Sequence, residues 1–151
     1  MRIYVDADAF PRELKEILYK AAERVHTPLV LVAGKPVKSP PSPYIFSLEV
    51  PGGVDAADDR IAELAEAGDL VITADIPLAD RVIGKGGFVI SPRGELYTNR
   101  NIKERLATRD LLSDLRNNGL VSGGPAAFSP KNRQAFADQL DRFLTKHTHN
   151  S

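Results

Sequence analysis

The start of the chain follows the order strand, helix, strand, and this order limits the fold more than any other feature. Residues 3–5 form a short apolar strand, and residues 14–25 repeat apolar side chains at the spacing of an amphipathic helix. Residues 29–33 form an uninterrupted apolar run, which is typical of a strand buried on both faces of a parallel sheet. These segments predict a βαβ unit and therefore an α/β fold.

The rest of the chain continues this alternation. The expected strands are residues 44–50, 70–73 and 88–91, and the expected helices are residues 55–67, 77–83, 99–118 and 130–145. Residues 34–43 contain four prolines and are expected to form an exposed loop, and Arg93-Gly94 is a turn that could close a hairpin. We expect a central, mainly parallel sheet of about five strands with helices on both faces.

Length and composition predict one domain without covalent or membrane partners. The 151 residues, 42% of them hydrophobic, suffice for a single core, which we place at residues 1–145 with a flexible tail at 146–151. The absence of cysteine excludes disulfides, thiolate metal sites and cysteine nucleophiles. No apolar run reaches membrane-spanning length and no N-terminal signal region is present, so we expect a cytoplasmic protein. The oligomeric state does not follow from the sequence.

The charges are balanced in number but divided along the chain. Residues 1–80 carry 8 basic and 14 acidic side chains, whereas residues 81–151 carry 12 basic and 6 acidic ones. This division suits an acidic metal-binding cluster bordered by a surface that attracts phosphates.

Aspartates follow two of the predicted strands. Asp6 and Asp8 come after the first strand, and Asp75 comes after residues 70–73. Since the carboxyl ends of parallel strands meet at one edge of a sheet, these side chains are expected to converge there. Asp8 could instead cap the following helix, whereas Asp75 has no expected structural role because Pro77 already marks the start of a helix.

A third group of acids begins the helix at residues 55–67. The helical spacing places Asp58 beside the apolar stripe that contains Ile61, so Asp58 can face the same sheet edge. Capping by Asp55 and the preference of helix starts for acids are equally open explanations. Asp80 is interpreted in this second way, as an acid at a helix start.

Carboxylates brought close together repel one another unless a proton or a cation joins them, and their hard oxygens favour Mg²⁺ or Mn²⁺. Such ions support phosphodiester hydrolysis. A histidine-based site has little support, because the three histidines lie at one helix end and in the tail. Residues 84–87 lack the spacing and the hydroxyl residue of a P-loop.

Taken in order, the acidic motifs and several segments of the second half closely resemble the bacterial YaiI/YqxD family of uncharacterised proteins. The segments that carry the resemblance are Asp6-Ala7-Asp8-Ala9, Gly53 to Asp59, Thr73 to Ala79, Arg105 to Asp110, Leu115-Arg116 and Gly123-Gly124-Pro125 to Ser129-Pro130. The resemblance covers nearly the whole chain. One position departs from the family pattern, because Phe10 stands where the family usually has cysteine.

The family is similar to PIN-like domains, and this similarity implies a three-layer sandwich with a nuclease site. In PIN-like nucleases, acids at the end of the first strand, in a central helix and after a Thr-x-Asp strand hold Mg²⁺ or Mn²⁺. Asp6, Asp58 and Asp75 occupy those places here, with Asp8 and Asp59 as auxiliary ligands.

Three hypotheses about function remain open. The first is a metal-dependent ribonuclease in which basic side chains contact the RNA backbone; the candidates are Arg12, Lys35, Lys38, Lys85 and Arg100. The second is a phosphatase similar to haloacid dehalogenases, with Asp6 as nucleophile and Asp8 as acid and base. The third is an RNA- or protein-binding module without catalysis.

Overall fold

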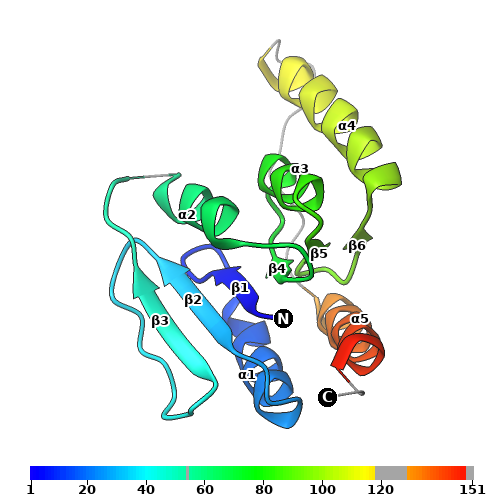
Figure 1. The fold of residues 1–151 in the computed structure, drawn as a ribbon. Helices are drawn as coiled ribbons and strands as arrows, with labels where there is room; N and C mark the ends of the chain where they lie inside the picture. Colours follow the sequence, from blue (N-terminus) through cyan, green and yellow to red (C-terminus); the bar gives the residue numbers. More distant parts are fainter. Residues whose placement is uncertain (54, 118–128, 149–151) are drawn as a thin grey trace.

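The computed structural model describes residues 1–53, 55–117 and 129–148. Within them, one sheet is surrounded by helices (Figure 1). The strands are β1 (Ile3–Asp6), β2 (Leu29–Ala33), β3 (Ile45–Glu49), β4 (Leu70–Ile72), β5 (Phe88–Ile90) and β6 (Leu96–Tyr97). The helices are the 3₁₀ turn η1 (Arg12–Leu14), α1 (Lys15–Arg24), α2 (Ala56–Leu64), α3 (Ile76–Gly84), α4 (Asn99–Asn117) and α5 (Pro130–Thr148).

The sheet has six strands in the order β3-β2-β1-β4-β5-β6. Every pair is parallel except β5 with β6, so the predicted α/β class and mainly parallel sheet are confirmed. The sixth strand arises from the turn at Arg93-Gly94, which forms the hairpin that the sequence left open. Gly94 has φ 91°, and a Cβ there would lie 2.6 Å from the backbone of Ala135, so a larger residue would have to displace α5.

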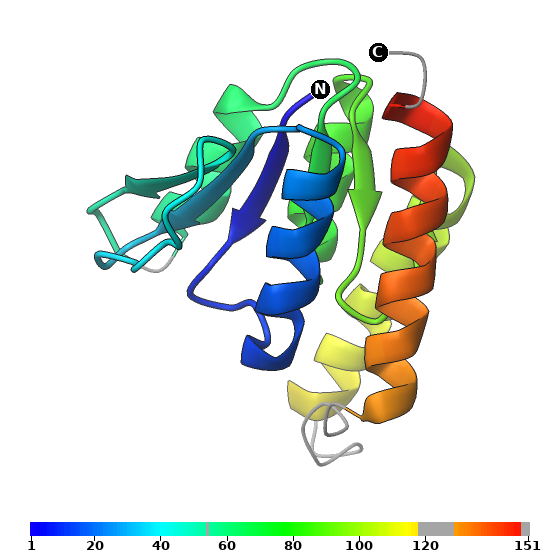
Figure 2. The same ribbon diagram turned by 90° about the horizontal axis from the view of Figure 1, so that it is seen from below.

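The helices form two layers on opposite faces of the sheet (Figure 2). Alternate strand side chains such as Ile3 and Val5 pack against α1 and α5, in a core that includes Leu18 and Phe136. The intervening side chains, such as Tyr4, pack against α2, α3 and α4. The single domain is therefore a three-layer sandwich, as predicted, because each apolar run supplies one row of side chains to each face.

Two helices end three residues away from the predicted position, whereas the other boundaries differ by at most one residue. Helix α2 ends at Leu64 rather than Ala67, since the Asp69 carboxylate accepts hydrogen bonds from the backbone N–H groups of Arg2 and Glu66 and holds this segment outside the helix. Helix α5 includes residues 146–148 of the predicted tail, where His147 stacks on Phe143 with ring centroids 4.2 Å apart. Residues 149–151 of that tail and the predicted turn at residues 123–125 lie outside the described residues.

Candidate active site

The candidate site lies where the strand order of the sheet reverses. The chain builds outward from β1 through β2 to β3, and then returns to pair β4 with the other side of β1. In open α/β sheets, the carboxyl ends of the two strands at such a reversal flank a crevice. Asp6 ends β1, and Thr73 to Asp75 follow β4, so the reversal brings these two acidic strand ends together.

The period of a strand determines which face Asp6 occupies. Asp6 follows Tyr4 by two positions, and Tyr4 packs into the core under α2 and α3. Thr73 follows Val71 in the same way from β4. Both strand ends therefore present polar side chains on the side of the sheet that α2 and α3 cover.

Asp58 reaches the same place from the first turn of α2. Ala57 and Ile61 are buried against the sheet and anchor this helix, which leaves Asp58 between them and the sheet edge. Its Oδ1 atom is buried and has no hydrogen-bond partner. Asp55 occupies the N-cap position without forming a side-chain cap, so the acids of this turn are not accounted for by capping.

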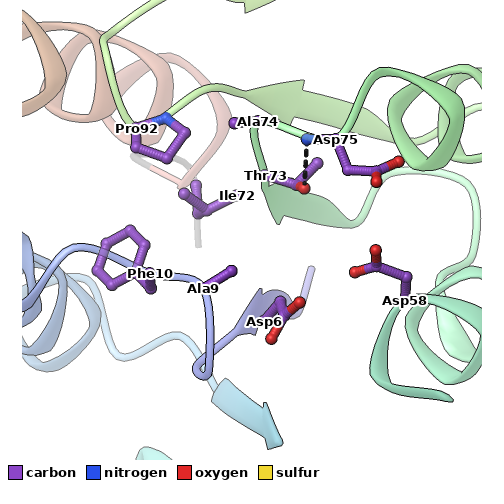
Figure 3. Close-up of a pocket in the computed structure, with 9 residues that line it drawn as sticks. All are labelled: Asp6, Ala9, Phe10, Asp58, Ile72, Thr73, Ala74, Asp75 and Pro92. Atoms are coloured by element: carbon purple, nitrogen blue, oxygen red, sulfur yellow. Dashed lines mark hydrogen bonds between the residues drawn. The ribbon is translucent and has the colours of Figure 1, made fainter. Parts of the chain in front are cut away.

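Asp6, Asp58 and Asp75 line one cavity of about 130 Å³. The other lining residues are Ala9, Phe10, Ile72, Thr73, Ala74 and Pro92. In Figure 3, Asp58 and Asp75 face one another from α2 and α3, and Asp6 faces the same space from the end of β1. The convergence expected from strand and helix periodicity is thus present for Asp6, Asp58 and Asp75, but not for Asp8.

Asp75 also has a structural role, and the prediction that it has none is wrong. It is the N-cap of α3, where its Oδ1 accepts a hydrogen bond of 2.8 Å from the backbone N–H of Leu78. Its own N–H donates to Oγ1 of Thr73 at 3.0 Å, the bond drawn in Figure 3. Pro77 occupies the second helical position rather than the first, so α3 starts early enough for Asp75 to cap it.

The three carboxylates perturb one another. Burial raises the pKa of Asp58 to about 7, and the negative charges of Asp6 and Asp75 add to the rise. A carboxyl group with this pKa holds its proton at mildly acidic pH and loses it near neutrality. A cation bound at this site would therefore stabilise the ionised form of Asp58.

Asp8 lies outside this cavity. Its Oδ2 accepts a 2.7 Å hydrogen bond from the N–H of Gly34, which follows β2, and its own N–H donates to Oδ1 of Asp6 at 3.1 Å. The N-cap residue of the following helical turn is Pro11, so Asp8 does not cap it. Asp8 thus joins the ends of β1 and β2.

Asp59 lines a second cavity, of about 290 Å³, which Asp58 and Asp75 also line. Its Oδ1 accepts a 2.9 Å hydrogen bond from Nη1 of Arg81, a residue of α3. Asp55 also lines this cavity. Asp80, interpreted from the sequence as a helix-start acid, forms an ion pair of 3.1 Å with Lys103 of α4.

The comparisons with known proteins agree with the resemblance found in the sequence. A family model described as an uncharacterised bacterial group, the YaiI/YqxD family, matches residues 4–146. The chain belongs to the YaiI/YqxD family. Relatives called UPF0178 protein include one from Hahella chejuensis, 58% identical over 97% of each chain, and one from Thioalkalivibrio sulfidiphilus, 58% identical over 97% of this chain and 99% of its own length. No solved structure matches the chain.

The family name gives no ligand, so the donor set must be judged by its geometry. Among the described residues, no group of three or more His, Asp or Glu side chains is arranged closely enough to hold a metal ion. The buried, unpartnered Oδ1 of Asp58 is nevertheless the kind of atom that a cation would satisfy. The oxygen-only donor set fits Mg²⁺ or Mn²⁺ in kind, although the side chains would have to move closer together to share one ion.

The five predicted RNA-binding residues do not line either cavity. Arg12 begins η1 just after the β1 loop, and Lys35 follows Gly34, so both lie at the carboxyl edge of the sheet. Lys38 is exposed in the loop before β3. Lys85 ends α3 and donates to the carbonyls of Ala62 and Glu63, and Arg100 is in the first turn of α4. Their contact with RNA stays a prediction.

Two residues of the site could not be found from the sequence. Pro92 reaches the cavity because the β5–β6 hairpin turns over the sheet edge, and Arg81 reaches Asp59 because α2 and α3 lie side by side. Both depend on tertiary packing. The nearest sequence signal was Pro92 itself, which marks the point where the pattern of alternating strands and helices changes.

None of the described helices combines the length and hydrophobicity needed to cross a membrane. With no cysteine in the sequence, the chain has no disulfide-linked partner.

Proposed function

We propose that this member of the YaiI/YqxD family is a divalent-metal-dependent nuclease that hydrolyses phosphodiester bonds of RNA. One observation carries the proposal: Asp58 has a buried carboxylate oxygen without a partner, and it faces Asp6 and Asp75 across one cavity. Such an arrangement is unfavourable without a compensating cation, since three like charges line one cavity and one of them is partly desolvated.

Asp6, Asp58 and Asp75 would hold Mg²⁺ or Mn²⁺. The bound ion would supply the acidified water and the positive charge that phosphodiester hydrolysis needs. The chain itself contributes the placement of the donors. The N-cap bond to Leu78 fixes one oxygen of Asp75, and the N–H of Asp8 orients Asp6. Asp58 is left to exchange its proton for the cation.

Two features favour a polynucleotide over a small phosphate ester as substrate. Asp58 and Asp75 line both cavities, so there is room for more than one phosphate group beside these carboxylates. Arg12 and Lys35 lie exposed along the same edge of the sheet, where they can contact flanking phosphates.

The phosphatase alternative has less support. That chemistry needs Asp8 beside the phosphate as acid and base, but the Asp8 carboxylate accepts from Gly34 and does not line the cavity. A non-catalytic binding module would not need three converging carboxylates, which favours the nuclease over that alternative too.

The proposal is tested with Asp6→Asn, which removes one donor charge while keeping the side-chain size. Cleavage of a fluorescently labelled single-stranded RNA is measured with Mn²⁺, and again after chelation with EDTA. We expect the wild type to cleave only with metal and Asp6→Asn to lose at least about a hundredfold in rate. Asp80→Asn is the matched control, because Asp80 is an aspartate of α3 outside both cavities. Equal cleavage by wild type and Asp6→Asn, with both folded by circular dichroism, would refute the proposal.

A further inference from the structure

The ion pair between Asp59 and Arg81 lines the second cavity next to the carboxylates. It joins the first turn of α2 to α3 on the solvent side, since the Arg81 and Asp59 side chains are 51% and 59% exposed. An ion pair this exposed contributes about 0–1 kcal/mol to stability. Its contribution to the fold is therefore small, and breaking it would cost little.

The charges around Arg81 are strongly unequal. The described residues that line this cavity include four aspartates (Asp55, Asp58, Asp59 and Asp75), and Arg81 is their one cation. The phosphate of a substrate approaching these acids would be repelled unless a cation faced it. Arg81 is placed to supply that cation from the protein itself.

The guanidinium of Arg81 has donors to spare. Nη1 donates to Oδ1 of Asp59 at 2.9 Å, and Asp59 is the one acceptor that Arg81 contacts among the described residues. A guanidinium carries five N–H donors in a planar fork that fits two phosphate oxygens at once. The exposed half of the side chain can therefore bind an anion, and leaving Asp59 would cost little.

The position of Arg81 on α3 brings it toward the site. It follows the N-cap Asp75 by six residues, or about 9 Å along a helix axis. Side chains on a helix lean toward its N-terminus, which here is the end that Asp75 caps. The guanidinium thus extends toward the second cavity, which Arg81 lines together with Asp58 and Asp75.

We propose that Arg81 binds a phosphate of the RNA substrate and that this phosphate displaces Asp59, which occupies the guanidinium until the RNA arrives. The inference rests on the proposed function, since it takes RNA as the ligand of the same site. It gives Asp59 the role of an acceptor that competes with the phosphate for Arg81, rather than that of a metal ligand.

The two partners of the pair give opposite expectations, and this separates phosphate binding from a structural role. Binding of a fluorescein-labelled single-stranded oligouridylate is followed by anisotropy with Mn²⁺, in an Asp6→Asn background that prevents turnover. Arg81→Gln is expected to weaken binding about tenfold. It should also reduce, by about one, the slope of the logarithm of the association constant against the logarithm of the salt concentration. Asp59→Asn frees the guanidinium and is expected to tighten binding about threefold.

Arg60→Gln is the matched control. Arg60 forms the same kind of exposed ion pair with Glu63, at 3.1 Å, but lines neither cavity, so its loss should leave RNA affinity unchanged. If Arg81→Gln and Asp59→Asn weaken binding alike, or if Arg81→Gln binds as tightly as its parent, the inference is wrong. Cleavage by the wild type is measured separately, so an inactive enzyme would refute the proposed function without deciding the role of Arg81.

Discussion

Apart from its three aspartates the first cavity is lined mainly by apolar side chains, whereas the second cavity is lined mainly by charged ones. Phe10, Ile72 and Pro92 belong to the first, and Asp59 and Arg81 belong to the second. Both cavities use the same two carboxylates. The difference suits a polynucleotide. The phosphate to be cleaved and its sugar would meet the first cavity, where Asp6, Asp58 and Asp75 would hold the cation, while a flanking phosphate would meet Arg81 in the second.

The largest effect is expected where the two cavities meet. Asp58→Asn removes one of the two carboxylate charges that line both cavities, so cleavage of labelled RNA with Mn²⁺ should fall at least about a hundredfold. Asp80→Asn should cleave like the wild type. If Asp58→Asn retained most of the activity, the reaction would not occur at the carboxylates that line both cavities.

Filling only the apolar cavity should have a smaller effect. Ala9 lines that cavity but is exposed, so Ala9→Leu can narrow the cavity without disturbing the core. Steady-state kinetics should show kcat/KM for RNA lowered roughly tenfold, with Mn²⁺ affinity unchanged. Ala107→Leu, an equal change on the exposed face of α4, is the control. An unaltered kcat/KM in Ala9→Leu would show that the substrate does not enter the cavity that Ala9 lines.

The burial of Asp58 and its repulsion by the neighbouring carboxylates should make the free energy of unfolding depend on pH when no metal is present. Burial raises the pKa of Asp58 from 3.8 to about 7, so the folded chain binds more protons than the unfolded chain between these values. The contribution of Asp58 to the free energy of unfolding should therefore fall as pH rises from about 4 to about 7. Asp58→Asn lacks this titration, and after allowance for solvent screening it should be more stable than the wild type at pH 8 by about 1–2 kcal/mol.

Urea denaturation in EDTA at pH 5 and pH 8 measures this difference. The gap between Asp58→Asn and the wild type should widen at the higher pH, and Asp80→Asn should follow the wild type at both. A gap that narrows toward pH 8 would mean that Asp58 is already ionised and compensated in the folded chain.

The smallest effect is expected outside both cavities, at Asp8. Asp8→Ala removes the acceptor for the N–H of Gly34 and should lower the free energy of unfolding by about 0.5–1 kcal/mol. Asp8→Asn keeps an acceptor oxygen and should lose less. Loss of RNA cleavage in a stable Asp8→Asn protein would instead assign Asp8 to the chemistry, as the phosphatase alternative requires.

The part of the site that follows from periodicity could be predicted from the sequence. The spacing of two residues in strands and of 3.6 residues in helices sufficed to bring Asp6, Asp58 and Asp75 to one edge of a parallel sheet. The same periodicities predicted a mainly parallel sheet with helices on both of its faces. The cap formed by Asp75 was missed because it depends on whether α3 starts at residue 76 or 77, a boundary that local pattern does not resolve.

The charged cavity could not be predicted, because it depends on the contact between two helices. Nothing in the sequence around Asp59 or Arg81 shows that α2 and α3 lie side by side, and the pairing appears only when both pack on the sheet. Pro92 was missed for a similar reason, since the direction of the β5–β6 hairpin is a tertiary feature. The sequence therefore predicted the carboxylates that line both cavities, but not the difference between the apolar lining of the first cavity and the charged lining of the second.

The central claim is that Asp6, Asp58 and Asp75 share a divalent cation, and a crystal structure of the protein grown with Mn²⁺ tests it most directly. The anomalous signal of manganese locates the ion independently of any assumption about its ligands. We predict a peak in the space between the three carboxylates, with oxygens of all three at about 2–2.5 Å. An empty site at saturating Mn²⁺, or a peak bound elsewhere while Oδ1 of Asp58 stays unpartnered, would contradict the account.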